Sequence, residues 1–211
     1  MKSILDRIFV DGLGGMAHGL FATLIIGTII QQIGLFAGGD FGNMLYMAGK
    51  MAAAMTGAGI GVGVARKFNA DQLVVVSAAT VGMNGAFAGK LLAGEVLTDG
   101  NVFLAGPGEP LGAFIAAYVG IFFGHMVSGK TKVDILVTPV VTIGSGCLVG
   151  FLIGPPISGF MSWLGSLINW GTEQQPFLMG IIVSVLMGMI LTLPISSAAL
   201  GVILNLSGLA A

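Results

Sequence analysis

Long apolar runs, separated by short polar connections, follow one another along most of the chain. A helix needs about 20 mostly apolar residues to cross a bilayer core about 30 Å thick. Runs long enough for this lie at residues 13–36, 43–65, 72–93, 110–127, 135–154 and about 176–193. Because a bilayer core offers no water to unpaired backbone groups, such runs predict helices. The pattern therefore predicts an all-α, polytopic integral membrane protein with about six spans.

Prolines interrupt the longest uncharged stretch, residues 135–172. As a single helix this stretch would be about 57 Å long, which exceeds one crossing of the bilayer core. Pro155 and Pro156 are therefore predicted to divide it. In the second part, residues 155–172, serines lie on one helical face and large aromatic and aliphatic residues on the other. This arrangement is typical of a helix at the membrane interface.

Both ends of the chain are predicted to differ from simple spans. Residues 1–11 place charged and apolar residues on opposite faces, which predicts an amphipathic helix on the membrane surface. Near the other end, Pro194 is expected to break the last apolar run and to begin a broken or re-entrant helix. Because the sequence stops among apolar residues at Ala211, we expect the chain, residues 1–211, to be a single transmembrane domain from the N-terminal part of a longer protein.

Basic residues are distributed unevenly among the connections between the predicted spans. They precede the first span and follow the second and the fourth: Lys2, Arg7, Arg66, Lys67, Lys130 and Lys132. The connections at residues 37–42, 94–109 and 155–175 contain no lysine or arginine. The positive-inside rule therefore places the N-terminus in the cytoplasm and the start of the segment around Glu109 on the outer side. The alternative that this segment folds back into the membrane stays open.

Composition supports the membrane interpretation and narrows the possible functions. Of the 211 residues, 55% are hydrophobic and only 8% are charged, whereas soluble domains carry about 25% charged residues. The net charge of −1 argues against a nucleic-acid partner. No histidine–cysteine cluster has metal-ligand spacing, and no serine, histidine and acid are placed for a catalytic triad. We therefore expect no metal, no cofactor and no self-contained catalytic site, with His18 and His125 packing or forming hydrogen bonds.

The segment from Gly106 to Pro110 surrounds one carboxylate with residues that break helices. Pro110 disfavours helical geometry at Glu109 and is expected to begin the fourth span. Glu109 then has two interpretations. It is either a solvated loop acid near a helix N-terminus, or a carboxylate that accepts hydrogen bonds from the hydroxyl groups of a sugar.

Polar side chains within predicted spans are candidates for a function because burying them in a membrane is costly. Lys50 lies within the second span, where it either extends toward the outer headgroups or faces a polar cavity. Lys90 is nearer the outer end of the third span, which favours extension to the headgroups. Asn84, in the same span, is expected to form a hydrogen bond to another helix.

Glycines alternate at positions 57, 59, 61 and 63 in the second predicted span. Residues 57 and 61 share one helical face, and residues 59 and 63 share another. The pattern is typical of close helix packing on two faces. The alternative is an unwound segment that lines a site.

Pro194, Ser196 and Ser197 form the strongest candidate for a broken helix. Proline removes a backbone donor, and either serine can cap a new helix. The N-terminus of such a half-helix would present free N–H groups to a polar substrate within the membrane. The alternative is a proline kink whose serines bond back to the backbone.

Three blocks carry a family resemblance: SGKTKVDILVTPVVT at 128–142, GPPISGFMSWLGSLINW at 154–170 and QPFLMGIIVSVLMGMILTLPISSAALG at 175–201. They resemble the EIIC-like membrane family of the bacterial phosphotransferase system, in the branch that includes perfringolysin-regulator-like proteins. The segment 106–110 also resembles the GxxEP motif of the wider family, whose glutamate contacts sugar. The family motif belongs to the later half of the chain, whereas Glu109 lies early.

The resemblance implies a homodimeric permease in the bacterial cytoplasmic membrane that binds and translocates a sugar. Cytoplasmic EIIA and EIIB partners would deliver phosphate from phosphoenolpyruvate to that sugar. On this interpretation the substrate-binding candidates are Glu109, Ser196, Ser197, Asn84 and Lys50. Two alternatives stay open, because fold does not determine function. One is a membrane sensor or regulator that does not transport, and the other is a transporter or channel independent of the phosphotransferase system.

Overall fold

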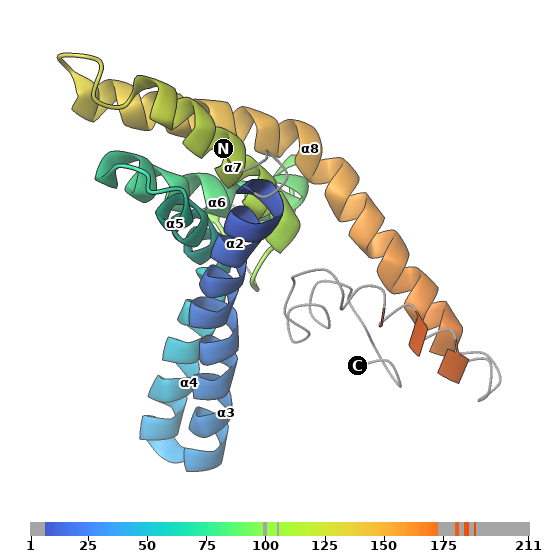
Figure 1. Cartoon of the computed structure of the whole chain (residues 1–211). Helices are drawn as coiled ribbons and strands as arrows, with labels where there is room; N and C mark the ends of the chain where they lie inside the picture. The colour runs from blue at the N-terminus through green and yellow to red at the C-terminus, as the bar shows by residue number, and fades with distance from the viewer. Residues whose placement is uncertain are drawn as a thin grey trace.

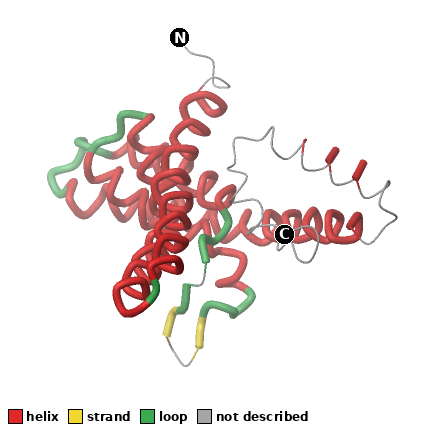
Figure 2. The backbone as a smooth tube through the Cα atoms, turned by 90° about the horizontal axis from the view of Figure 1, so that it is seen from below, coloured by secondary structure: helices red, strands yellow, loops and turns green. Residues whose placement is uncertain are grey.

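The computed structural model describes residues 7–98, 101–104 and 106–172, with residues 180, 181, 184, 185 and 188 (Figure 1). In chain order its helices are η1 (Arg7–Gly12), α2 (Leu13–Leu20), η2 (Phe21–Ile25), α3 (Ile26–Ala37), α4 (Gly39–Ala54), α5 (Thr56–Lys67), α6 (Gln72–Leu92), α7 (Pro110–Val127) and α8 (Asp134–Thr172). The helices η1 and η2 are π-helical. Two short antiparallel strands, β1 (Leu97–Thr98) and β2 (Asn101–Val102), form a hairpin that precedes α7 (Figure 2).

Four helical stretches of the described residues are long and apolar enough to cross a membrane. They are Val10–Ala37, Gln72–Leu92, Pro110–Val127 and Asp134–Leu167. The helical, membrane-spanning character predicted from the sequence is therefore confirmed for this part of the chain. The predicted break at Pro194, residues 1–6 of the amphipathic lead-in and most of the predicted sixth span lie outside the described residues.

The predicted second span is wrong as a single helix, because the chain forms two helices there. Helix α4 ends at Ala54 and α5 begins at Thr56, with Met55 between them at φ −81° and ψ 10°. Helix α4 packs along α3 in a hairpin that projects from the other helices, whereas α5 lies among α2, α6 and α7 (Figure 1). Because the two helices have different packing partners, the chain changes direction at Met55.

The alternating glycines of α5 bring it into backbone contact with helices on two sides. A Cβ atom on Gly57 would lie 2.7 Å from a carbonyl oxygen of α6, and one on Gly61 would collide with another. On the opposite face, a Cβ atom on Gly59 would lie 3.0 Å from a carbonyl oxygen of α2, and one on Gly63 would also collide with that helix. The facing carbonyl groups belong to Gly15, Gly19, Ala78 and Gly82. The close-packing interpretation is confirmed, and the segment is helical.

Helix α8 is continuous, so the predicted division at Pro155 and Pro156 is wrong. The helix contains 39 residues and passes through both prolines as well as Pro139. Proline removes a backbone hydrogen bond and bends a helix without always ending it, and α8 bends along its length (Figure 1). Contacts on both sides of the prolines hold it against α6. Gly154 packs against Ala88, and Ser158 packs against Gly89.

Replacing Gly61 with alanine is expected to lower the free energy of unfolding by about 1–3 kcal/mol. The added methyl group would collide with the carbonyl oxygen of Ala78. Gly144→Ala is the matched control, because a Cβ atom there meets nothing within 4 Å and alanine is favoured over glycine in a helix by about 1 kcal/mol. Unfolding in mixed micelles with increasing dodecyl sulfate would measure both variants. Equal stability of the two would contradict close packing at Gly61.

Candidate functional site

The glycine- and proline-rich loop before α7 places its backbone against α6. Gly106 and Gly108 have φ angles of 78° and 69°, which glycine adopts at little cost. A Cβ atom on Gly108 would lie 2.8 Å from both the Cβ atom and the carbonyl oxygen of Ala86. The next residue, Glu109, donates its backbone N–H to that same carbonyl oxygen over 2.7 Å. The absence of a side chain at Gly108 therefore permits the contact that positions Glu109.

Glu109 directly precedes α7 but does not cap it through its side chain. Its backbone is extended, with φ −96° and ψ 107°, and no cap hydrogen bond comes from its carboxylate. Proline disfavours helical geometry in the residue before it and needs no donor at the first helical position. Helix α7 therefore begins at Pro110, as predicted, and the Glu109 side chain is available for other contacts.

The Glu109 carboxylate lies where the loop, α6 and α8 meet. The hydroxyl group of Ser158 on α8 donates a hydrogen bond to Oε1 over 3.1 Å. The other oxygen, Oε2, is buried and has no hydrogen-bond partner among the described residues. On the α6 side, a Cβ atom on Gly89 would lie 2.6 Å from Oγ of Ser158, so a glycine makes room for the serine. One carboxylate oxygen is thus held by the protein and one is left as an acceptor without a donor.

Burial dominates the electrostatics of Glu109, which lies just before the membrane-spanning segment that begins at Pro110. Removal from water raises the pKa of this carboxyl, while the hydrogen bond from Ser158 and the positive charge of Lys90 act in the opposite direction. Burying a carboxylate is costly unless hydrogen bonds or a positive charge compensate. A ligand that donated a hydrogen bond to Oε2 would stabilise the charged form further.

The other predicted site residues do not join Glu109 in the described structure. Lys50 is exposed on α4, with its ammonium group 5.7 Å from the ring centre of Tyr46 one turn earlier. Asn84 donates from its amide nitrogen to the carbonyl oxygen of Thr80 over 3.1 Å, within the same helix. Among the described residues, the expected bond from Asn84 to another helix is not found. Ser196 and Ser197 lie outside the described residues.

The two histidines have different surroundings. His18 is exposed, and its Nδ1 lies 2.6 Å from the carbonyl oxygen of Gly14 in the preceding turn. His125 is half-buried on α7, and its Nε2 atom has no hydrogen-bond partner in the described part of the chain. Among the residues the structure describes, no group of three histidine, cysteine or acidic side chains could hold a metal ion.

A polar network joins the connections at the other end of α6, α7 and α8. The hydroxyl group of Ser128 donates to Oδ2 of Asp71 over 2.6 Å. The Oδ1 atom of Asp134 accepts from the backbone N–H of Gly129 over 2.9 Å and from the hydroxyl group of Thr138 over 2.6 Å. These bonds fix the start of α8 and tie the loop after α7 to the start of α6. Sequence reasoning did not identify this network, although the aspartates directly precede or begin apolar helices.

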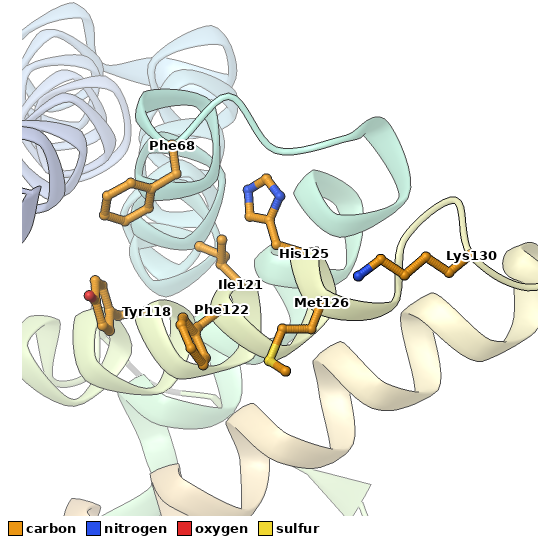
Figure 3. A pocket seen from close by; sticks show the side chains of 7 residues that line it. All are labelled: Phe68, Tyr118, Ile121, Phe122, His125, Met126 and Lys130. Atoms are coloured by element: carbon orange, nitrogen blue, oxygen red, sulfur yellow. The ribbon is translucent and has the colours of Figure 1, made fainter. Parts of the chain in front are cut away.

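A pocket of about 520 Å³ lies beside α7, and Glu109 is not among the residues that line it (Figure 3). Sequence reasoning did not identify this pocket either. Its lining residues are Phe68, Tyr118, Ile121, Phe122, His125, Met126 and Lys130. The spacing of four residues from Tyr118 to Phe122 to Met126 was the available signal, because it places these side chains on one helical face. From the sequence alone, this pattern predicts an ordinary lipid-facing surface.

Replacing Glu109 with glutamine is expected to change how stability depends on pH. Burial raises the carboxyl pKa above its usual 4.5, so the stabilising contribution of Glu109 is present below that pH and is lost as pH rises through the folded-state pKa. Glutamine stays neutral throughout. The stability of Glu109→Gln relative to wild type should therefore increase as pH rises from 4.5 through the folded-state pKa, measured by thermal unfolding in detergent. Glu95→Gln is the control, because Glu95 is exposed in the same connection. A flat difference for Glu109→Gln would contradict burial of this charge.

Comparison with known proteins identifies the family of this chain. Residues 10–211 match the family described as Phosphotransferase system, EIIC. Neither the curated proteins nor the solved structures gave a match. The family match covers every span and site residue described above and confirms the resemblance of the three sequence blocks. The chain is thus a multi-pass membrane protein that belongs to the phosphotransferase system EIIC family.

Proposed function

We propose that the chain is the sugar permease component of a phosphoenolpyruvate-dependent phosphotransferase system in a bacterial cytoplasmic membrane, with its N-terminus in the cytoplasm. The observation that carries this proposal is the family match over residues 10–211. The chain would bind a sugar and carry it across the membrane. Its partners EIIA and EIIB would pass a phosphoryl group from phosphoenolpyruvate to a sugar hydroxyl group, so that no phosphate-carrying residue is needed in this chain.

Glu109 is the proposed contact for the sugar. Its Oε2 atom is buried with no donor among the described residues, while Oε1 is held by Ser158. A charged carboxylate accepts hydrogen bonds from adjacent hydroxyl groups, the chemistry that a sugar presents. The backbone bond from Glu109 to Ala86 fixes the position of the residue without using its side chain. Ser158 would orient the carboxylate, and Lys90 would offset part of the cost of keeping it charged.

Ser196 and Ser197 remain proposed as further substrate contacts at the N-terminus of a half-helix that begins after Pro194. Lys50 has weaker support, because it is exposed on the α3–α4 hairpin and contacts Tyr46. Asn84 also has weaker support, because its amide nitrogen is used within α6. The proposed site therefore centres on Glu109.

Glu109→Gln is expected to raise the KM for sugar uptake roughly 10-fold or more, because a hydrogen bond to a charged group contributes about 1.5–3 kcal/mol. The measurement uses membrane vesicles that contain the full-length protein, its EIIA and EIIB partners and phosphoenolpyruvate, with a panel of radiolabelled sugars. Glu95→Gln should keep a KM close to that of wild type.

Two failures of this experiment would have different meanings. If wild-type vesicles accumulate no sugar of the panel, the permease proposal is wrong and a regulator without transport is favoured. If wild type transports and Glu109→Gln has an unchanged KM, the chain is a permease but Glu109 is not its sugar contact.

A further inference from the structure

The pocket beside α7 changes from apolar to cationic along the direction of the membrane-spanning helix. From Tyr118 to Met126 it follows α7 for about 12 Å at a rise of 1.5 Å per residue. Helix α7 ends at Val127, and the last lining residue, Lys130, belongs to the loop beyond it. Figure 3 shows the lysine side chain extending back toward Met126 and His125. The apolar part of the pocket thus lies at membrane depth, and the positive charge lies at the end of the span.

The apolar walls come from α7 and from the residue that follows α5, and they are open on one side. The ring of Phe68, which follows α5, meets the ring of Tyr118 edge-on with centres 5.6 Å apart. Ile121 is fully buried behind them, whereas Phe122 and Met126 are 57% and 52% exposed. Exposed apolar side chains on a membrane-spanning helix face lipid chains rather than water. The pocket is therefore a recess that opens toward the hydrocarbon core.

The cationic end of the pocket is formed by the lysine among its lining residues. Lys130 is exposed, and no ion pair to it is found among the described residues. The two nearby acids are engaged elsewhere: Asp71 accepts a hydrogen bond from Ser128, and Asp134 accepts bonds from its own loop and helix. This end therefore offers an anion an exposed ammonium group that forms no ion pair with a described acid.

We propose that this pocket binds an anionic phospholipid, with an acyl chain along Phe68, Tyr118 and Phe122 and the phosphate beside Lys130. A phospholipid has the same order of apolar and charged parts along the membrane normal as the pocket has along α7. A sugar fits less well, because the lining offers few hydrogen-bonding groups for many hydroxyls. A soluble anion would leave the aromatic recess empty. Basic residues next to a span are a known means of attracting anionic headgroups, and the positive-inside pattern predicts that this end lies in the cytoplasmic leaflet.

This proposal does not depend on sugar transport, and it is tested by chemical labelling inside the pocket. The full-length protein carries Met126→Cys together with Cys147→Ser, so that the introduced thiol is the one in residues 1–211. Reaction with a maleimide is followed in detergent micelles that contain increasing phosphatidylglycerol or phosphatidylcholine with identical chains. Phosphatidylglycerol is expected to slow labelling at least fivefold at saturation, and phosphatidylcholine less than twofold, because only the former carries a net negative charge.

Two matched variants assign the effect to the pocket. Lys130→Gln is expected to raise the half-effective phosphatidylglycerol concentration roughly fivefold, which corresponds to the loss of one basic residue near a membrane surface. Lys132→Gln lies in the same loop but does not line the pocket, so it should change that concentration less than twofold. Met51→Cys in the Cys147→Ser background is the labelling control, because Met51 is exposed on α4 away from the pocket. Its labelling should not distinguish the two lipids.

Several results would overturn the proposal. They are equal protection by the two lipids, no protection by either, equal effects of Lys130→Gln and Lys132→Gln, and protection by inorganic phosphate alone. The last result would indicate a soluble-anion site. A second measurement guards against disturbance by the cysteine substitution: phosphatidylglycerol should raise the thermal unfolding midpoint of wild type more than that of Lys130→Gln. Equal shifts would also count against the pocket.

Discussion

The backbone contacts that glycines allow between helices hold this structure together. Helices within a bilayer gain little from hiding apolar surface from one another, because lipid chains are equally apolar. Close approach of backbones, with the dispersion contacts it brings, then provides much of the association. Helix α5 is fixed between α2 and α6 in this way. The same device repeats between α6 and α7, where a Cβ atom on Gly112 would lie 2.6 Å from the carbonyl oxygen of Gly85.

The position of Glu109 follows from these contacts. Because α7 begins close against α6, the N–H group of Glu109 reaches the carbonyl oxygen of Ala86. Because Gly89 has no side chain, Ser158 of α8 can approach the same place. The carboxylate is therefore positioned by backbone and small residues from three segments that are distant in sequence. Ser158 holds one of its oxygens, and the other has no hydrogen-bond partner among the described residues.

Sequence reasoning succeeded where a single local property determines the outcome. The apolar length between polar connections gave the bounds of α7 and nearly those of α6, and glycine spacing gave the two packing faces of α5. It failed where tertiary contacts override a local preference. The prolines of α8 were expected to end a helix, yet contacts with α6 on both sides of them favour continuation. The turn at Met55 depends on α4 and α5 having different neighbours, which no local pattern records.

The candidate site was only partly predictable for a related reason. The loop around Glu109 was recognisable, because its helix-breaking residues are adjacent in sequence. Ser158 was expected on the serine face of a helix at the membrane interface, and no local pattern indicates that this serine meets Glu109. The pocket beside α7 was missed because aromatic residues spaced along one face of a span are ordinary for a lipid-facing surface. The pocket differs from such a surface because Phe68, which follows α5, packs against Tyr118 of α7.

The continuity of α8 gives the protein a mechanical element that two separate helices would lack. Its first turn is anchored through Asp134, and the serine that holds Glu109 lies 24 residues further along the same helix, or about 36 Å at helical rise. Pro155 and Pro156 remove backbone hydrogen bonds about one turn before that serine. Helix α8 is therefore one long element that bends more easily at its prolines than elsewhere. A tilt of the anchored end would be taken up mainly at the prolines, at Pro139 near the anchor and at Pro155 and Pro156 near the carboxylate, rather than evenly along the helix.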